Sequence, residues 1–298
     1  MVKCKINRVM SMRKLSVLLS ILGMSASLYA NPGLIQIVAA ENFYGSVAQN
    51  IGAPYVQVTS VLNNPVADPH SFSAGADVAK AVDKANIVIE NGAGYDVWMD
   101  RLYQASSKKA VLINVGNIMN VLPSQNPHIW YAPQTMPAFA QALTLRLSAL
   151  DPAHASEYQK NLSYFLQRAN LFNFRVTKVR RQVTGESMTA TEPVFDNLAT
   201  ALGLKILNMP LQWKVMNGVP LSPQEIIAFE ASLSAHQVKV LVYNNQVVDP
   251  VVEQFKAIAQ QNNIPVIGVS ELMPANTTYY HWMHQNLENV AHALGVKA

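Results

Sequence analysis

Short apolar stretches alternate along this chain with segments of helical periodicity, and no other feature limits the fold as strongly. In one such segment, residues 76–85, Val78, Ala81, Val82 and Ala85 recur at helical spacing. Strands that alternate with helices of this length predict parallel sheets with helices on both faces. The stretches with the length and composition of strands are 34–40, 55–62, 86–91, 110–115, 204–210, 238–245 and 264–270.

The segment from Asp151 to Val183 divides this pattern into two parts. Asp151 and Pro152 have the form of an N-cap and a first helical turn, and no glycine or further proline follows before Gly185. A helix of about thirty residues spans roughly 45 Å, which is too long for a connection between neighbouring strands. We therefore predict an α/β protein of two lobes, each a parallel sheet flanked by helices, joined by one long rigid helix.

Further helices are expected around the second set of strands. Ser222 and Glu225 form a capping box that begins one of them, and others are predicted at 42–51, 250–262 and 278–294. The predicted boundaries are a signal peptide at 1–30, an N-terminal lobe at 31–150, the linking helix at 151–184 and a C-terminal lobe at 185–298.

The first 30 residues have the form of a secretory signal peptide. They contain five basic residues and no acidic one, followed by the apolar run LSVLLSILGMSASLYA, which ends at Ala30. This run is shorter than the roughly 20 residues that a membrane-spanning helix needs, so cleavage is favoured over a membrane anchor.

The net charge of +4 includes the basic residues of this leader and does not describe the chain without it. Once the five basic residues are removed, 17 basic residues face 18 acidic ones, and no basic stripe remains that would bind nucleic acid. Because half of the residues are apolar and 13% are charged, extensive disorder is excluded. The only cysteine, Cys4, lies in the leader, and a lipid anchor would require a cysteine at the cleavage site. We predict a soluble monomer in the periplasm that is not lipid-anchored.

Four polar residues follow predicted strands at their carboxyl ends, where open α/β folds place their binding sites. They are His70, His128, Glu192 and Glu271. Since two belong to each predicted lobe, they can converge only between the lobes. Two imidazoles and two carboxylates suit a divalent first-row transition-metal ion.

Each of these residues also has an ordinary structural interpretation. A histidine beside a proline, as in Pro69-His70, is commonly a turn residue, and a glutamate after a strand commonly caps a helix. Asp68 is better explained as a turn former than as a ligand. No single residue would support a metal site, so the hypothesis depends on all four lying at strand ends.

Several longer motifs resemble one known family. The segments ADPHSF, NGAGYDVWMDRL and NPHIWY, with the residues that follow them, are similar to the metal-binding solute-binding proteins of ABC transporters, the zinc and manganese group. The similarity extends from about Ile35 to the C-terminus. It implies a protein that is not an enzyme, that captures a metal ion outside the cytoplasm, and that delivers it to a membrane permease with its ATPase.

The resemblance also implies a set of ligands, because His70, His128, Glu192 and Glu271 match the family's ligand positions. Many zinc members have a histidine in place of Glu192 and a long His-rich loop before the second ligand, and this chain has neither. The match to Glu271 needs a small gap, so Asp249 is the second candidate for the fourth ligand. The two carboxylates favour Mn²⁺ or Fe²⁺ in relative terms, although Zn²⁺ should still bind tightly.

Two other functions compete with metal transport. A secreted metallohydrolase is disfavoured because the chain has neither H-E-x-x-H nor G-x-S-x-G, and four protein ligands would close the shell of a four-coordinate ion. A surface adhesin or structural protein with a metal site is the other alternative. Stabilisation of the folded protein by metal would distinguish the transport protein from it.

Overall fold

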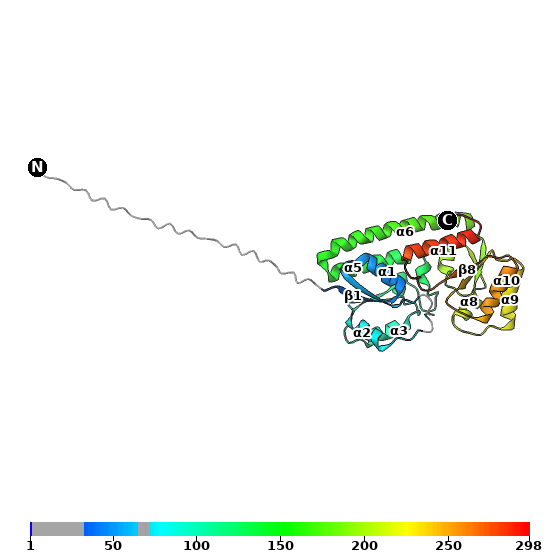
Figure 1. Cartoon of the computed structure of the whole chain (residues 1–298), viewed down its shortest axis with the longest axis horizontal. Coiled ribbons are helices and arrows are strands. Elements are labelled where there is room, and N and C mark those ends of the chain that lie inside the picture. The colour runs from blue at the N-terminus through cyan, green and yellow to red at the C-terminus, as the bar shows by residue number, and fades with distance from the viewer. Residues whose placement is uncertain (2–32, 65–68, 70–71) are drawn as a thin grey trace. The chain divides into compact units, whose positions relative to one another are not determined.

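Within the part of the chain that the structure describes, two four-stranded parallel sheets form the framework (Figure 1). The computed structural model describes residue 1, residues 33–64, residue 69 and residues 72–298, and Leu34–Ala298 form one compact unit. The first sheet has the order β2-β1-β3-β4, and the second has the order β6-β5-β7-β8. The strands are β1 (Ile35–Glu41), β2 (Val56–Leu62), β3 (Ile87–Glu90), β4 (Val111–Asn114), β5 (Ser187–Ala190), β6 (Lys205–Leu207), β7 (Val240–Asn244) and β8 (Val266–Val269).

Helices connect these strands, as the alternating pattern predicted. The predicted architecture of two parallel sheets flanked by helices is confirmed, and every predicted strand stretch overlaps an observed strand. The helices are α1 (Asn42–Gly52), α2 (Ala76–Lys84), α3 (Val97–Ala105), α4 (Val115–Met119), α5 (Thr135–Leu150), α6 (Ala155–Val183), α7 (Asp196–Leu202), α8 (Met209–Met216), α9 (Pro223–Ser234), α10 (Pro250–Gln261) and α11 (Tyr279–Ala293), with short 3-10 helices at Ile129–Tyr131 and Pro152–His154.

Both faces of the first sheet are buried, and strand β1 shows this directly. Ile37 and Ala39 belong to the large core that includes residues of α1 and α5. The alternate residues Val38 and Ala40 pack into a separate cluster with residues of α2 and α3. Because successive side chains of a strand point to opposite faces, this division explains why the strand is apolar along most of its length.

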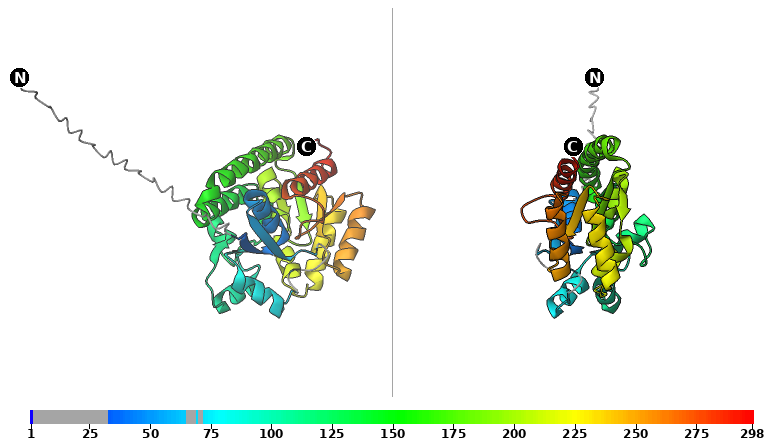
Figure 2. Two further views of the ribbon diagram at one scale, coloured as in Figure 1. Left: turned by 60° about the vertical axis from the view of Figure 1, so that its left-hand side comes forward. Right: turned by 90° about the vertical axis from the view of Figure 1, so that its right-hand side faces the viewer.

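The long helix α6 begins slightly later than predicted. A 3-10 turn over Pro152–His154 precedes it, because the Asp151 carboxylate accepts hydrogen bonds from His154 Nδ1 at 2.6 Å and from the Tyr158 hydroxyl at 2.8 Å. From Ala155 to Val183 the helix is continuous and packs against α1, α5, α7 and α11. Figures 1 and 2 show α11 lying beside it. It therefore contacts helices that precede and helices that follow it in the chain. The exact lobe boundaries stay a prediction.

One apolar core extends across both sheets. It includes Ile37 and Ile89 of the first sheet and Val240 and Val242 of the second. Hydrogen bonds add to this connection, since the hydroxyl of Tyr131 donates to the carbonyl of Ser270 at 2.8 Å. The two sheets are therefore joined by packing and by specific polar contacts as well as by α6.

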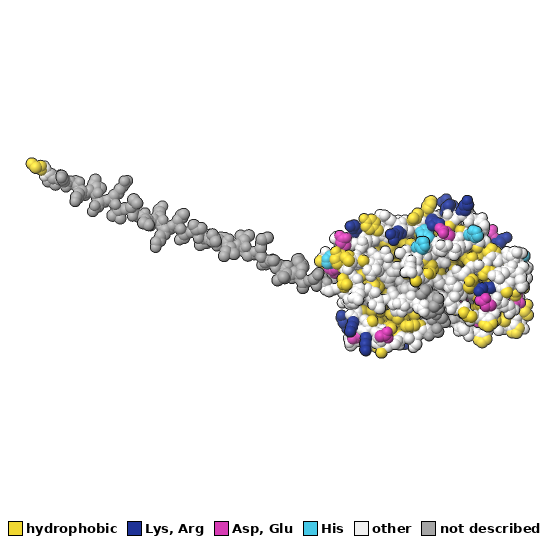
Figure 3. Space-filling model, viewed as in Figure 1, with side chains coloured by type: hydrophobic (Ala, Val, Ile, Leu, Met, Phe, Trp, Pro, Cys, Tyr) yellow, Lys and Arg dark blue, Asp and Glu magenta, His cyan; other side chains and the backbone are white. Residues whose placement is uncertain are grey.

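Among the described residues, no helix has both the length and the apolar content that crossing a membrane would require. On the face of the molecule drawn in Figure 3, Lys and Arg side chains are interspersed with Asp and Glu.

The carboxyl ends of the strands lie together at one edge of each sheet. In the first sheet Glu90 pairs with Asn114, and in the second Asn244 pairs with Val269. Because every pairing is parallel, the loops that leave these ends emerge on the same side. These loops carry the residues of the candidate site.

Candidate functional site

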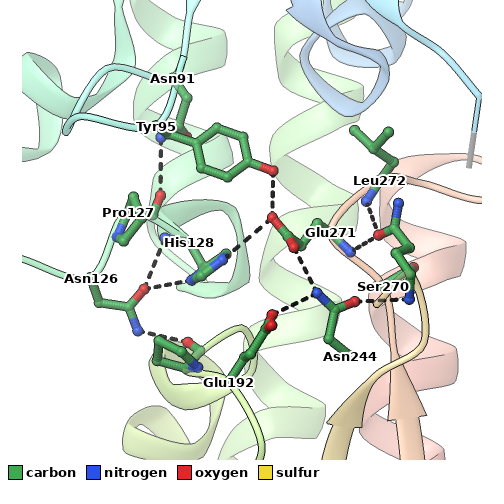
Figure 4. A network of polar contacts seen from close by, with 12 residues as sticks. Asn91, Tyr95, Asn126, Pro127, His128, Glu192, Asn244, Ser270, Glu271 and Leu272 are labelled. Carbon is green, nitrogen blue, oxygen red and sulfur yellow. Dashed lines mark hydrogen bonds and ion pairs between the residues drawn. The ribbon is translucent and has the colours of Figure 1, made fainter. Parts of the chain in front are cut away.

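Three of the four predicted ligands lie in the described part of the chain, and all three are buried. His128 immediately precedes the 3-10 helix Ile129–Tyr131, Glu192 follows β5 by two residues, and Glu271 follows β8 by two residues. Their exposed fractions are 0%, 4% and 0%. Figure 4 shows that they lie in one network of polar contacts, to which both halves of the chain contribute.

The orientation of His128 is set by Asn126, two residues earlier. Asn126 Nδ2 donates to the carbonyl of Pro193 at 2.7 Å, so the amide oxygen is the atom that faces His128. That oxygen accepts from the backbone N–H of His128 at 2.9 Å and lies 2.8 Å from its Nδ1. An amide oxygen can only accept, so Nδ1 carries a proton and donates to Asn126, while Nε2 is the ring nitrogen directed toward Glu271.

Glu271 contacts groups from both halves of the chain (Figure 4). Its Oε2 lies 3.5 Å from His128 Nε2 and accepts a hydrogen bond from the Tyr95 hydroxyl at 2.6 Å. Burial, followed by the nearby charge of Glu271, raises the pKa of Tyr95 well above its ordinary value. Tyr95 therefore stays protonated and acts as a donor to the carboxylate.

A third residue, Asn244, joins the two carboxylates. Its Nδ2 donates to Glu192 Oε2 at 2.7 Å and to Glu271 Oε1 at 2.7 Å. The backbone N–H groups of Glu271 and Leu272 both donate to the side-chain oxygen of Gln246, which holds the loop after β8 in place. Asn244 is the last residue of β7 and Gln246 follows it closely, so one strand end supports both carboxylates.

Aromatic side chains surround the imidazole. The ring of Trp130 lies 5.2 Å from that of His128, centroid to centroid, and 5.0 Å from that of Tyr95. Trp130 is fully buried and also stacks on Phe43 at 4.6 Å. These rings exclude water from one side of the histidine and restrict its rotation.

The remaining predicted ligands have different outcomes. His70 lies outside the described residues, as does Asp68, while Pro69 between them is buried. Asp249, the alternative to Glu271, caps α10, and its Oδ1 accepts from the backbone N–H of Val251 at 2.7 Å. Glu271, by contrast, lies in the buried network beside His128.

In the described part of the chain, no three His, Cys, Asp or Glu side chains are arranged so that they could hold a metal ion among them. His128 approaches Glu271, but the amide nitrogen of Asn244 lies between Glu271 and Glu192. The four-ligand site therefore stays a prediction, and it requires His70 as well as these three residues.

The sequence did not identify the residues that orient the ligands. Tyr95 lies in the NGAGYDVWMDRL segment, and its hydroxyl donates directly to Glu271. Asn126 and Asn244 were not singled out. Asn244 ends a parallel strand, and the rule that selected the two glutamates would have selected it too if amides had been considered.

Comparisons with known proteins agree on one family. The family model described as "Zinc-uptake complex component A periplasmic" matches residues 37–293. The metal ABC transporter substrate-binding lipoprotein SloC of Streptococcus mutans is 25% identical, over 95% of this chain and 99% of that protein. The manganese ABC transporter substrate-binding lipoprotein PsaA of Streptococcus mitis is 22% identical, over 87% of this chain and 89% of that protein.

The fold also matches a solved structure. The periplasmic zinc binding protein TroA from Treponema pallidum matches with a TM-score of 0.74 over 88% of this chain and 99% of that one. At 16% sequence identity this similarity establishes the fold alone.

The comparisons correct one prediction. A periplasmic protein that is not lipid-anchored was expected, but the relatives from Streptococcus mutans and Streptococcus mitis are both named lipoproteins, which contradicts it. The expectation rested on one observation. A lipid anchor needs a cysteine at the cleavage site, which was assumed to lie near Ala30, whereas the sole cysteine is Cys4. The absence of a cysteine at one assumed cleavage position was insufficient grounds for it.

The family model covers most of the chain, and the resemblance of the NGAGYDVWMDRL and NPHIWY segments agrees with it. The chain belongs to the family of metal-binding solute-binding proteins of ABC transporters.

Proposed function

We propose that this protein captures one divalent transition-metal ion outside the cytoplasm, with His70, His128, Glu192 and Glu271 as ligands, and delivers it to an ABC permease. Residues 1–30 would direct its export, and the protein would act as a monomer without catalysing a reaction. Manganese is named for PsaA and zinc for the matching family model, and these names support a transition-metal ion as the cargo.

The observation that carries this proposal is the burial of His128 together with the hydrogen bond of its Nδ1. A buried imidazole whose Nδ1–H is held by an amide oxygen has the form of a metal ligand supported by a neighbouring acceptor. Its Nε2 lies 3.5 Å from Glu271 Oε2, which provides an anionic donor from the other half of the chain. A nitrogen and a carboxylate oxygen at this separation can bind the same ion.

The ion would be held as cargo, so the chemistry asked of these residues is binding and release. Neutral imidazole and carboxylate together suit several first-row ions, and their affinities follow the Irving–Williams order. Zn²⁺, Mn²⁺ and Fe²⁺ are all candidates. Tyr95 and Trp130 would limit the access of water and thereby strengthen the electrostatic attraction of the buried carboxylates for the ion.

The test is a titration of metal-free protein. The metal content of protein purified without added metal is measured by elemental analysis, and Zn²⁺ and Mn²⁺ are then titrated separately and in competition by calorimetry. We expect one ion per chain. His128→Ala should weaken binding at least about tenfold, since even the loss of a group that only supports a ligand costs about 10–100-fold.

His292→Ala provides the matched control, because His292 is exposed near the end of α11. This variant should bind metal like the unchanged protein. Equal affinity for His128→Ala and the unchanged protein would contradict the proposed ligand set, and the absence of any binding would contradict the function.

A further inference from the structure

The amide of Asn244 donates to one oxygen of Glu192 and to one oxygen of Glu271, and these two carboxylates would need the same oxygens to chelate an ion through both of their oxygens. We propose that Asn244 is a specificity-determining residue, which limits Glu192 and Glu271 to one metal-binding oxygen each and thereby favours Zn²⁺ over Mn²⁺. This inference rests on the proposed function and adds to it a reason for discrimination between ions.

The distances define the restriction. Asn244 Nδ2 lies 2.7 Å from Glu192 Oε2 and 2.7 Å from Glu271 Oε1, and all three side chains are at most 4% exposed (Figure 4). A metal ion bonds to carboxylate oxygen at about 2.0–2.2 Å. An ion that used these two oxygens together would therefore compete with the amide N–H groups for them.

The amide cannot simply turn its oxygen toward the carboxylates. Asn244 Oδ1 accepts from the backbone N–H of Gln246 at 3.1 Å, so the other end of the amide, the NH₂ group, is the end that faces Glu192 and Glu271. A reversed amide would direct its oxygen at two carboxylates and lose both donors, which is unfavourable in a buried site. The backbone of Asn244 is fixed as well, because it ends strand β7.

The carboxylate oxygens that Asn244 does not contact are Glu192 Oε1 and Glu271 Oε2. Glu271 Oε2 lies 3.5 Å from His128 Nε2. Two donors held at about 2.0–2.2 Å by one tetrahedral ion lie about 3.4 Å apart, which matches this separation. In an octahedral shell with bonds of about 2.1 Å, neighbouring donors lie about 3.0 Å apart. The spacing of nitrogen and oxygen in this structure is thus closer to the tetrahedral value.

The consequence is a preference between ions. His128 Nε2 and two singly bound carboxylates supply three donors, which matches the low donor number of the closed tetrahedral shell typical of protein-bound Zn²⁺. Octahedral ions such as Mn²⁺ gain more from additional oxygen donors, and Asn244 withholds two of them. The donor types alone favour Mn²⁺ in relative terms, so the amide acts against the preference set by the carboxylates.

The experiment compares the unchanged protein with Asn244→Leu, which keeps the size of the side chain and removes both donors. Dissociation constants for Zn²⁺ and Mn²⁺ are measured by competition calorimetry. We expect the ratio of the Mn²⁺ constant to the Zn²⁺ constant to fall about tenfold, at the lower end of the effects seen when a group supporting a ligand is lost. X-ray absorption at the manganese edge should show at least one additional oxygen neighbour in the variant.

Asn161→Leu is the matched control. Asn161 lies on helix α6, and its amide donates to the carbonyl of Ile51 at 3.0 Å. This variant should leave the ratio unchanged. If Asn244→Leu does not fold, as judged by circular dichroism, Asn244→Ser is measured instead and should lower the ratio in the same direction.

The outcomes separate this inference from the proposed function. If the unchanged protein binds neither ion, the proposed function is wrong and the inference falls with it. If the unchanged protein binds both ions, and the ratio and the number of oxygen neighbours are the same in the Asn244 variants, the inference alone is wrong.

Discussion

Amide side chains control how the charged and ionisable groups of this site present their donor atoms. Asn126 accepts a hydrogen bond from Nδ1 of His128, and Asn244 donates to one oxygen each of Glu192 and Glu271. Because amides do not titrate, the donors and acceptors that they present to these groups do not change with pH. Side chains held by such hydrogen bonds have less freedom to lose when they bind a ligand, which reduces the entropy lost on binding.

A second feature at the residue scale is the buried carboxyl group of Asp196, at the start of α7. The residue is 4% exposed, and burial raises the pKa of Asp196 to about 7. A carboxyl group with a raised pKa binds its proton more tightly in the folded state than in the unfolded one. Its contribution to stability is therefore complete below the unfolded pKa of about 4, and it is lost as the pH rises through about 7.

The variant Asp196→Asn, which imitates the protonated carboxyl group, should remove this dependence on pH. It should be more stable than the unchanged protein at pH 8, and its advantage should be larger there than at pH 5 by about 2 kcal/mol. The free energy of unfolding of the metal-free proteins in urea, measured at both pH values, provides the comparison. Asp77→Asn serves as the control because Asp77 is exposed. An advantage that does not change between pH 5 and pH 8 would contradict the raised pKa.

At the scale of elements, helix α6 and the shared core determine how the two sheets can move. The helix extends without interruption from Ala155 to Val183 and buries Phe165, Phe172 and Val179 against its neighbours. The hydroxyl of Tyr279 also donates to the carbonyl of Trp130 at 2.6 Å, which ties α11 to the loop that carries His128. A wide hinge motion would have to break this packing and these bonds.

We therefore expect metal release to involve side chains and loops of the site while the sheets keep their relative arrangement. Small-angle scattering should give nearly the same radius of gyration for the protein with and without bound metal. Addition of Mg²⁺, which prefers oxygen ligands and keeps several waters, serves as the control for an effect of ionic strength. A change of several ångströms with Zn²⁺ but not with Mg²⁺ would show that the elements do move.

For the molecule as a whole, the sequence predicted the architecture better than the site. Strands such as 238–245 are largely apolar on both faces, and the alternation of strands and helices leaves few arrangements other than parallel sheets. The start of α6 was misplaced by a few residues because the local bonds of Asp151 to His154 and Tyr158 have no signature in the hydrophobic pattern.

The site was predicted less completely, for a physical reason. Strand ends identified Glu192 and Glu271, and the structure brings both to Asn244. The contact between Tyr95 and Glu271 joins residues separated by 176 positions, so no local pattern could reveal it. Neither could the sequence show which oxygen of each carboxylate would be engaged, since that depends on the packing of several loops.

The most direct test of the proposed metal site is the position of a bound zinc ion, determined by anomalous diffraction at the zinc edge from crystals grown with Zn²⁺. We predict one strong peak per chain, at about 2.0–2.2 Å from His128 Nε2, Glu192 Oε1 and Glu271 Oε2, with a nitrogen of His70 as the fourth donor. A peak located elsewhere, or bonded to Asp249 in place of Glu271, would contradict the proposed site.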